Sequence, residues 1–212
     1  MKRKIALLLT LAMLMSLSLF GCGTPDKTPG NTPGETDDTT EKESAAPEET
    51  TPASEGNKQL VAELGPNPET IDPALNSAVD GGNMLLFAFD CLLNIDKDNK
   101  VIPGAAESFK TSEDGLTWTF KLRSGLKWSD GSDLTAEDFV YSWKRVADPD
   151  TAAPYAQTVL GMVEGYDEAA AGDPDKLAVS APDATTFEVK LVHPCVYFDK
   201  LAAFATLSPV NK

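Results

Sequence analysis

The sequence contains few of the residue patterns on which catalysis or metal binding depends. His193 is the only histidine, so any Ser-His or Cys-His nucleophilic scheme would have to use it. It stands beside Pro194, with no glycine-flanked nucleophile near it. The spacings Cys-x-x-Cys, His-x-x-x-His and Gly-x-x-x-x-Gly-Lys do not occur. We therefore expect no catalytic residue, no metal site and no cofactor, and we expect His193 to be either hydrogen-bonded or exposed.

Acidic residues are so frequent that any one carboxylate pair carries little information. The chain holds 33 Asp and Glu residues against 18 Lys and Arg residues, and its formal net charge is −15. Most of these side chains are expected on the solvated surface. A paired general acid and base stays open, so a secreted hydrolase is one alternative function. An acidic chain also repels phosphate backbones, which disfavours nucleic acid as a partner.

The first residues are typical of a secretory signal. Basic residues occupy positions 2–4, and an apolar run that is too short to span a bilayer follows over residues 5–15. Residues 19–22, Leu-Phe-Gly-Cys, resemble the bacterial lipobox, whose cysteine is diacylated and becomes the new N-terminus. We expect a signal peptide over residues 1–21 and lipidation of Cys22, which would anchor the protein to a membrane. The alternative is cleavage by an ordinary signal peptidase near Gly23.

The next segment has the composition of a disordered linker. Residues 23–57 consist mainly of Thr, Pro, Gly, Asp, Glu and Ser, which bury too little apolar surface to fold. We expect residues 22–57 to form a solvated tether between the lipid anchor and a folded part that begins at Lys58. No later apolar stretch approaches the roughly 20 residues that a membrane-spanning helix needs.

The two remaining cysteines could pair in an oxidising exterior, but their surroundings favour separate thiols. Cys91 lies in an apolar run that we interpret as helical, and Cys195 stands beside Pro194 at the expected end of a strand. Spacing alone does not decide pairing. We expect two buried thiols, with a disulfide as the alternative.

Residue periodicity predicts an α+β fold with mixed β-sheets. Strict alternation over residues 116–122 indicates a strand with one buried face. Thr135 and Asp138 have the spacing of a helix capping box, and an apolar stripe at helical spacing follows it. The other expected elements are a strand at 58–64, a buried helix at 82–93, a hairpin at 95–102 and a strand at 187–191. The aromatic residues at these spacings are expected in the core: Trp118, Phe120, Trp128, Phe139 and Trp143.

Three longer stretches carry a family resemblance. Residues 114–123, DGLTWTFKLR, are followed by GLKWSDG at 125–131 and LTAEDFVYSW at 134–143. These motifs resemble the extracellular solute-binding proteins that serve peptide and nickel importers, including the oligopeptide-binding proteins. Further matches lie at 71–74, 147–156 and 194–198, so the resemblance extends over residues 58–212.

The resemblance implies the N-terminal part of a bilobal, periplasmic-binding-protein-like fold. Residues 58–89 would form the first segment of the large lobe, and residues 90–212 most of the smaller lobe. The remaining lobes would be absent. In this family, peptides lie extended between the lobes and pair with the protein backbone in strand fashion.

The ligand-pairing segment of the family carries over to Ser77, Ala78 and Val79, and a ligand-contacting tyrosine carries over to Tyr155. Oligopeptide binders often have an acid and a glycine where this chain has Ser77 and Ala78. Without the resemblance, residues 77–79 would be interpreted as an ordinary loop, and Tyr155 could equally be a half-buried anchor.

These expectations together indicate a binding function in which the ligand is not chemically altered. The chain would capture oligopeptides outside the cell and deliver them to the membrane subunits of an ABC permease. It would act as a monomer held by its lipid anchor at the outer face of the cytoplasmic membrane or on the periplasmic side. The alternatives are a secreted hydrolase and a surface receptor or adhesin that binds peptide without import. Dipeptides, nickel complexes and oligosaccharides stay open as ligands.

Overall fold

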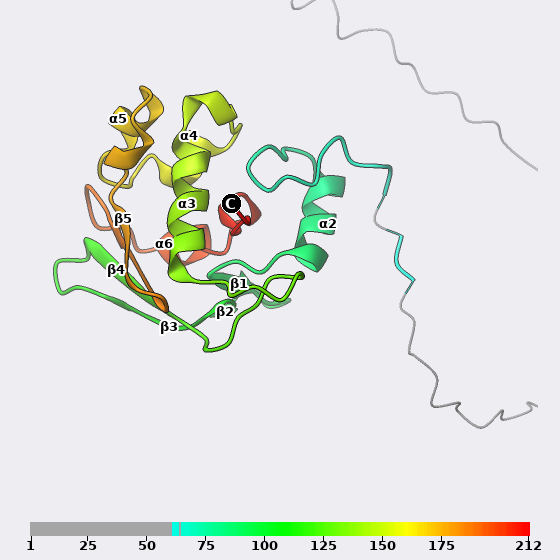
Figure 1. Cartoon of the computed structure of the whole chain (residues 1–212), viewed down its shortest axis with the longest axis horizontal. Coiled ribbons are helices and arrows are strands. Elements are labelled where there is room, and N and C mark those ends of the chain that lie inside the picture. The colour runs from blue at the N-terminus through cyan, green and yellow to red at the C-terminus, as the bar shows by residue number, and fades with distance from the viewer. Residues whose placement is uncertain (1–60, 64) are drawn as a thin grey trace, which may run out of the picture. The chain divides into compact units, whose positions relative to one another are not determined.

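The computed structural model describes residues 61–63 and 65–212, within a compact unit formed by residues 58–212 (Figure 1). The expected signal peptide, the expected lipidation site Cys22 and the expected linker lie outside the described residues. Within the described ranges, no helix is both long enough and apolar enough to cross a membrane.

The described chain combines helices with antiparallel strands. In chain order the elements are α2 (Val79–Ala88), β1 (Leu93–Ile95), β2 (Val101–Pro103), β3 (Ala106–Thr111), β4 (Thr117–Leu122), α3 (Ala136–Ala147), η1 (Pro149–Thr151), α4 (Ala156–Leu160), α5 (Tyr166–Ala170), η2 (Pro174–Lys176), β5 (Val179–Asp183), β6 (Thr186–Lys190), α6 (Phe198–Leu201) and η3 (Ala205–Leu207). The class is therefore α+β, as expected. Every strand pairing among the described residues is antiparallel, so the expected mixed pairing does not occur in this part of the fold.

A four-stranded sheet in the order β3-β4-β6-β5 supports the core. Trp118 pairs with Val189 and Phe120 with Phe187, and all four side chains are buried. The residues between them, such as Thr119 and Lys121, point to the other face of the sheet because successive strand residues alternate. The strands predicted over 116–122 and 187–191 are thus confirmed, and so is the hairpin predicted over 95–102, which β1 and β2 form.

Helix α3 packs against β5 and β6 and closes the core (Figure 1). The predicted capping box begins this helix, with the Thr135 amide donating to the Asp138 carboxylate at 2.7 Å. The predicted apolar stripe is buried, and the Trp143 ring meets Phe187 edge-on at 4.9 Å between centroids. Four of the five aromatic residues expected in the core are buried, while Trp128 is only half-buried.

Two of the predicted elements are wrong in extent. The strand expected over 58–64 is absent from its described residues, 61–63, where Val61 is 85% exposed. No described strand pairs with them, and an unpaired extended segment gains no ladder hydrogen bonds. The helix expected over 82–93 begins earlier, at Val79, and ends at Ala88, because Phe89 turns into extended backbone with φ −125° and ψ 154°.

Helix α2 is also far more exposed than the buried helix that the sequence predicts. Only Gly81 and Leu85 are buried, whereas Leu86 is 69% and Phe87 66% exposed. The apolar residues on all faces of this segment indicated burial on all sides. In the described unit only one side of the helix, the side that carries Leu85, is covered.

Cys91 and Cys195 are separate buried thiols, as predicted, and His193 is exposed. The Cys91 sulfur lies 3.1 Å from the Ser208 hydroxyl. Burial raises the pKa of the Cys91 thiol to about 11. The neutral thiol's contribution to stability is therefore complete below the unfolded-state pKa of about 8.5 and is lost as the pH rises through about 11.

We expect these thiols to be unreactive in the native chain. With Cys22 replaced by serine, labelling of the folded protein at pH 8 with an aromatic disulfide reagent should be on the order of a hundredfold slower than labelling in denaturant, because the reagent needs an exposed thiolate. Rapid stoichiometric labelling of the folded chain would contradict this burial.

Candidate functional site

A neutral groove lies between the start of α2, the residue before α4 and the turn η3. Its volume is 310 Å³. The residues that line it are Asn76, Ser77, Ala78, Val79, Gly82, Asn83, Leu85, Leu86, Tyr155, Phe204, Ala205 and Thr206. This list contains all four residues to which the sequence assigned ligand contact, so the fold brings Tyr155 to the segment 77–79.

The segment Ser77–Val79 lies exposed along the rim of the groove, where the chain enters α2. Ala78 is extended, with φ −110° and ψ 152°. The Asn76 side chain braces this backbone, because its Nδ2 donates to the Ala78 carbonyl at 3.1 Å. Gly81 allows this arrangement, since a β-carbon there would collide with Asn76 Oδ1 and lie 2.9 Å from the Thr70 carbonyl. The segment is thus held in place and open to solvent, with extended backbone at Ala78 and the start of α2 at Val79.

Tyr155 forms part of the opposite wall. Its ring meets the Phe204 ring edge-on at 5.4 Å between centroids, and its carbonyl accepts a hydrogen bond from Val159 in α4 at 3.0 Å. The side chain is half-buried and packs against the core cluster. Tyr155 is therefore both an anchor of the fold and a surface of the groove.

An ion pair fixes the loop that carries the segment. Arg145 of α3 donates to both carboxylate oxygens of Asp72, at 3.0 and 2.6 Å. The Asp72 carboxylate also accepts from the Ala74 amide at 3.0 Å. The hydrogen bonds from Arg145 hold the pKa of Asp72 below its usual value, and the same pair raises the pKa of Arg145. This bidentate geometry is the stronger form of a carboxylate pair, and it ties residues 72–76 to α3.

Residues 100–212 match the family model described as bacterial extracellular solute-binding proteins, family 5 Middle. The chain belongs to this family. It is 42% identical to the periplasmic oligopeptide-binding protein OppA of Salmonella typhimurium over 156 residues, covering 72% of this chain and 28% of that relative. It is 37% identical to the oligopeptide-binding protein OppA of Bacillus subtilis over 162 residues, covering 75% and 29%. The Haemophilus influenzae OppA structure, in complex with the peptide RPPGFSPFR, superposes with a TM-score of 0.67 at 38% identity, covering 70% and 29%.

The family 5 solute-binding proteins are binding proteins, and the relatives are named for oligopeptide binding. The chain spans about 28 to 29% of the length of these curated relatives. The described residues therefore represent one part of a periplasmic-binding-protein fold, as the sequence motifs indicated.

Sequence reasoning missed several residues of the groove in this family 5 protein. Leu85 is 1% exposed and forms the floor, while Thr206 of η3 and Phe204, the residue before η3, lie more than a hundred positions further along the chain. Among these unpredicted groove residues, only Asn76 could have been identified from the sequence. An Asn two residues before Ala78 is the spacing at which an amide side chain binds its own backbone in an Asx turn.

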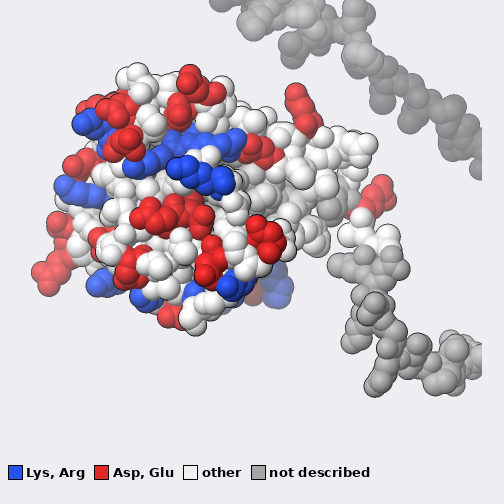
Figure 2. Space-filling view, viewed as in Figure 1, with Lys and Arg blue, Asp and Glu red and all other residues white. Residues whose placement is uncertain are grey.

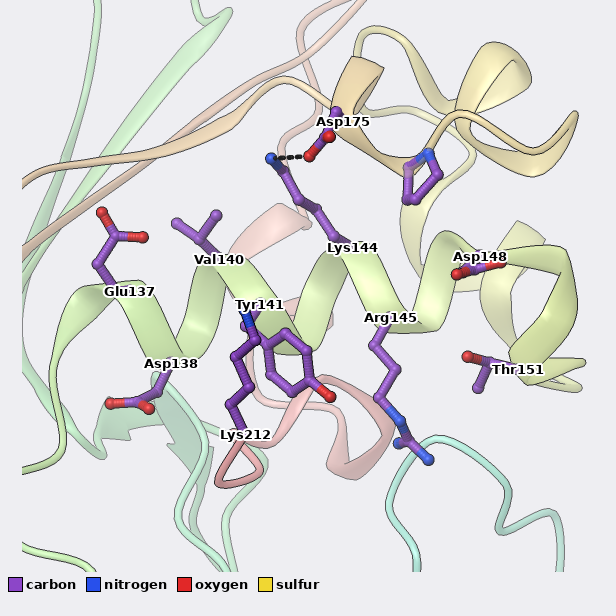
Figure 3. Close-up of a pocket in the computed structure, with 11 residues that line it drawn as sticks. Glu137, Asp138, Val140, Tyr141, Lys144, Arg145, Asp148, Thr151, Asp175 and Lys212 are labelled. Atoms are coloured by element: carbon purple, nitrogen blue, oxygen red, sulfur yellow. Dashed lines mark hydrogen bonds and ion pairs between the residues drawn. The ribbon is translucent and has the colours of Figure 1, made fainter. Parts of the chain in front are cut away.

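A larger pocket of 640 Å³ lies on the outer side of α3, but its basic groups already have partners. Lys144 donates to Asp175 at 2.8 Å, Arg145 donates to Asp72, and Lys212 lies over the Tyr141 ring (Figure 3). Figure 2 shows basic side chains gathered over α3 and flanked by acidic ones. The basic side chains that line this pocket therefore already interact with other residues of the chain.

Metal coordination finds no ready-made site in the described part of the chain. No group of three or more His, Cys, Asp or Glu side chains there has the geometry to hold a metal ion. The groove can offer backbone hydrogen bonds along residues 77–79, neutral amides and hydroxyls, and apolar walls. Those groups suit the binding of an extended, uncharged backbone.

Proposed function

We propose that this chain is the N-terminal part of a lipoprotein that captures oligopeptides outside the cell and delivers them to an ABC permease without altering them. The observation that carries the proposal is the convergence of Ser77–Val79 and Tyr155 on one neutral groove. Those residues are more than 70 positions apart in the sequence. Family membership and the printed names of the relatives support the same ligand class.

In this proposal the peptide lies along the exposed segment as an added strand. Ala78 already has extended backbone angles. The Val79 amide belongs to the first turn of α2, where helix N–H groups have no partner within the helix, and it donates to none of the described residues. Backbone pairing of this kind supplies affinity that is common to all peptide sequences.

Residues 58–89 would then form the first segment of the large lobe and residues 90–212 most of the smaller one. A bilobal receptor gains affinity by closing around its ligand and excluding water. The groove described here is one wall of such a cleft, so we expect this chain to bind peptides far more weakly than a full-length relative. Closure would signal to the permease only if the ligand stabilises the closed form over the open one.

The anchor and location follow from the sequence. Diacylated Cys22 would hold a monomer at the outer face of the cytoplasmic membrane or on the periplasmic side, and residues 22–57 would act as its tether. A hydrolase draws no support from the groove, because its described lining contains no histidine and no carboxylate. A receptor that binds peptide without import would use the same groove, and uptake of labelled peptide by cells with and without the gene distinguishes it from an importer.

Replacing Val79 with proline tests the backbone pairing directly. Position 79 is the first residue of α2, where proline is tolerated, and the preceding Ala78 already has the extended angles that proline imposes on its neighbour. The substitution removes one amide donor at an exposed position. We expect peptide affinity to fall about tenfold, since a lost hydrogen bond costs about 1 to 1.5 kcal/mol, while the unfolding midpoint changes little.

Val79→Ala is the matched control, because it removes the same side chain and keeps the amide. Binding of a mixed tetrapeptide library is best followed through the amide resonances of residues 77 and 78 in NMR titrations of the full chain, because the proline variant has no amide proton at position 79. Equal affinities for the proline and alanine variants would sink the proposed pairing. Submicromolar affinity in the chain itself would contradict the expectation that one wall binds weakly.

A further inference from the structure

We infer that the groove beside Ser77–Val79 is a selective pocket for a neutral, apolar ligand side chain, in preference to a charged one. The inference rests on the proposed function, because it concerns the side chain of a peptide whose backbone pairs with that segment. It goes beyond that function by assigning a specificity to a site whose backbone contacts are indifferent to sequence.

The walls of the groove are apolar where they are deepest. Leu85 is 1% exposed at the floor, and the Phe204 ring, 38% exposed, stands beside the Tyr155 ring. Leu86 extends the wall toward solvent at 69% exposure. Ligand carbon atoms placed against these surfaces would be removed from water, which contributes about 25 cal/mol for each Å² that is buried.

Among the residues that the structure describes, none of those lining the groove carries a charge. Its polar members are the amides of Asn76 and Asn83, the hydroxyls of Ser77 and Thr206, and the Tyr155 phenol. Asp80, the nearest acid along the chain, is absent from the lining, and its β-carbon lies toward Gly65 instead. Figure 2 shows few charged side chains over α2, in contrast to the surface over α3.

A charged ligand side chain would therefore lose hydration in the groove without gaining an ionic partner. Burial of an unpaired ammonium or carboxylate is unfavourable, whereas an aromatic or branched aliphatic side chain would find ring faces and methyl groups. The groove volume of 310 Å³ leaves room for one large side chain. The groove should therefore distinguish charged from neutral ligand side chains more strongly than it distinguishes neutral side chains of different shape.

The test uses the full chain and tetra-alanine peptides that carry one Phe, Lys or Glu at each position in turn. We expect one position at which the Phe peptide binds about tenfold more tightly than the Lys and Glu peptides. Resonances of Leu85 and Tyr155 should shift most with that Phe peptide. Affinities within about twofold at every position, with residues 77–79 still perturbed, would overturn the inference and leave the proposed function standing. If no peptide perturbs residues 77–79, the proposed function fails, and the inference fails with it.

A charge placed in the wall gives a second, independent readout. Leu86→Glu is expected to bring the Lys peptide at the selective position about two- to fivefold closer to the Phe peptide, as a half-exposed ion pair allows. Phe87→Glu is the matched control, because Phe87 is 66% exposed on the same helix but does not line the groove. The same preference in both variants, or in neither, would count against the pocket assignment. Leu86 is exposed, so unfolding does not complicate the comparison.

Discussion

Replacing Trp143 with alanine is expected to lower the free energy of unfolding by about 3 to 5 kcal/mol, the usual cost of deleting a fully buried aromatic side chain. Trp143 is 0% exposed at the centre of the core, with its ring against Phe187 and Phe198. Its indole also donates to the Leu207 carbonyl at 3.2 Å. That bond fixes η3, which supplies part of the groove wall, so the loss should extend to peptide binding.

A pair of Trp-to-Phe variants separates packing from the hydrogen bond. Trp118 is likewise buried, but its indole N–H has no partner among the described residues. Trp143→Phe leaves the Leu207 carbonyl unsatisfied and should cost about 1 to 2 kcal/mol more than Trp118→Phe. Chemical denaturation measures both. Equal losses would show that the bond to η3 contributes nothing to stability.

Replacing Arg145 with glutamine should destabilise the protein by about 1 to 3 kcal/mol and weaken peptide binding as well. The change leaves the Asp72 carboxylate, only 28% exposed, without its bidentate partner. Because Asp72 also holds the Ala74 amide, the loop that presents Ser77 should become less ordered. Lys144→Gln is the matched control, since its partner Asp175 is 85% exposed and such pairs contribute little.

The ion pair between Asp72 and Arg145 also makes the stability of the folded protein depend on pH in the acid range. The pKa of Asp72 is lowered in the folded protein, so its contribution is complete above the unfolded-state value of about 3.9 and is lost as the pH falls through the folded value. The stability difference between the native chain and Arg145→Gln should therefore shrink below about pH 4. The pKa of Asp183 is also lowered in the folded protein, to about 2. Because Asp183 is present in both proteins, its titration contributes equally to their stabilities and does not affect the difference between them. A difference that stays constant to pH 2 would indicate that the pair carries no linked stability.

Local patterns in the sequence determined the central part of this protein. The alternation around Trp118 and Phe120 predicted β4, and the spacing of Thr135 and Asp138 predicted the start of α3. Both are properties of neighbouring residues, since a strand repeats every two positions and a helix every 3.6. The aromatic motifs of the same region also indicated the family, because they consist largely of core residues whose packing defines the fold.

Other features were decided only by the tertiary structure. The end and exposure of α2 could not be predicted, because an apolar run of this length suits a buried helix or a helix covered on one side equally well. The groove likewise depends on contacts between residues far apart. Asp72 and Arg145 are separated by 73 positions, and Phe204, the residue before η3, contacts Tyr155. Local periodicity cannot predict contacts between residues that are far apart in the sequence. Those contacts depend on how the sheet packs against α3 and on where that packing places the connecting loops.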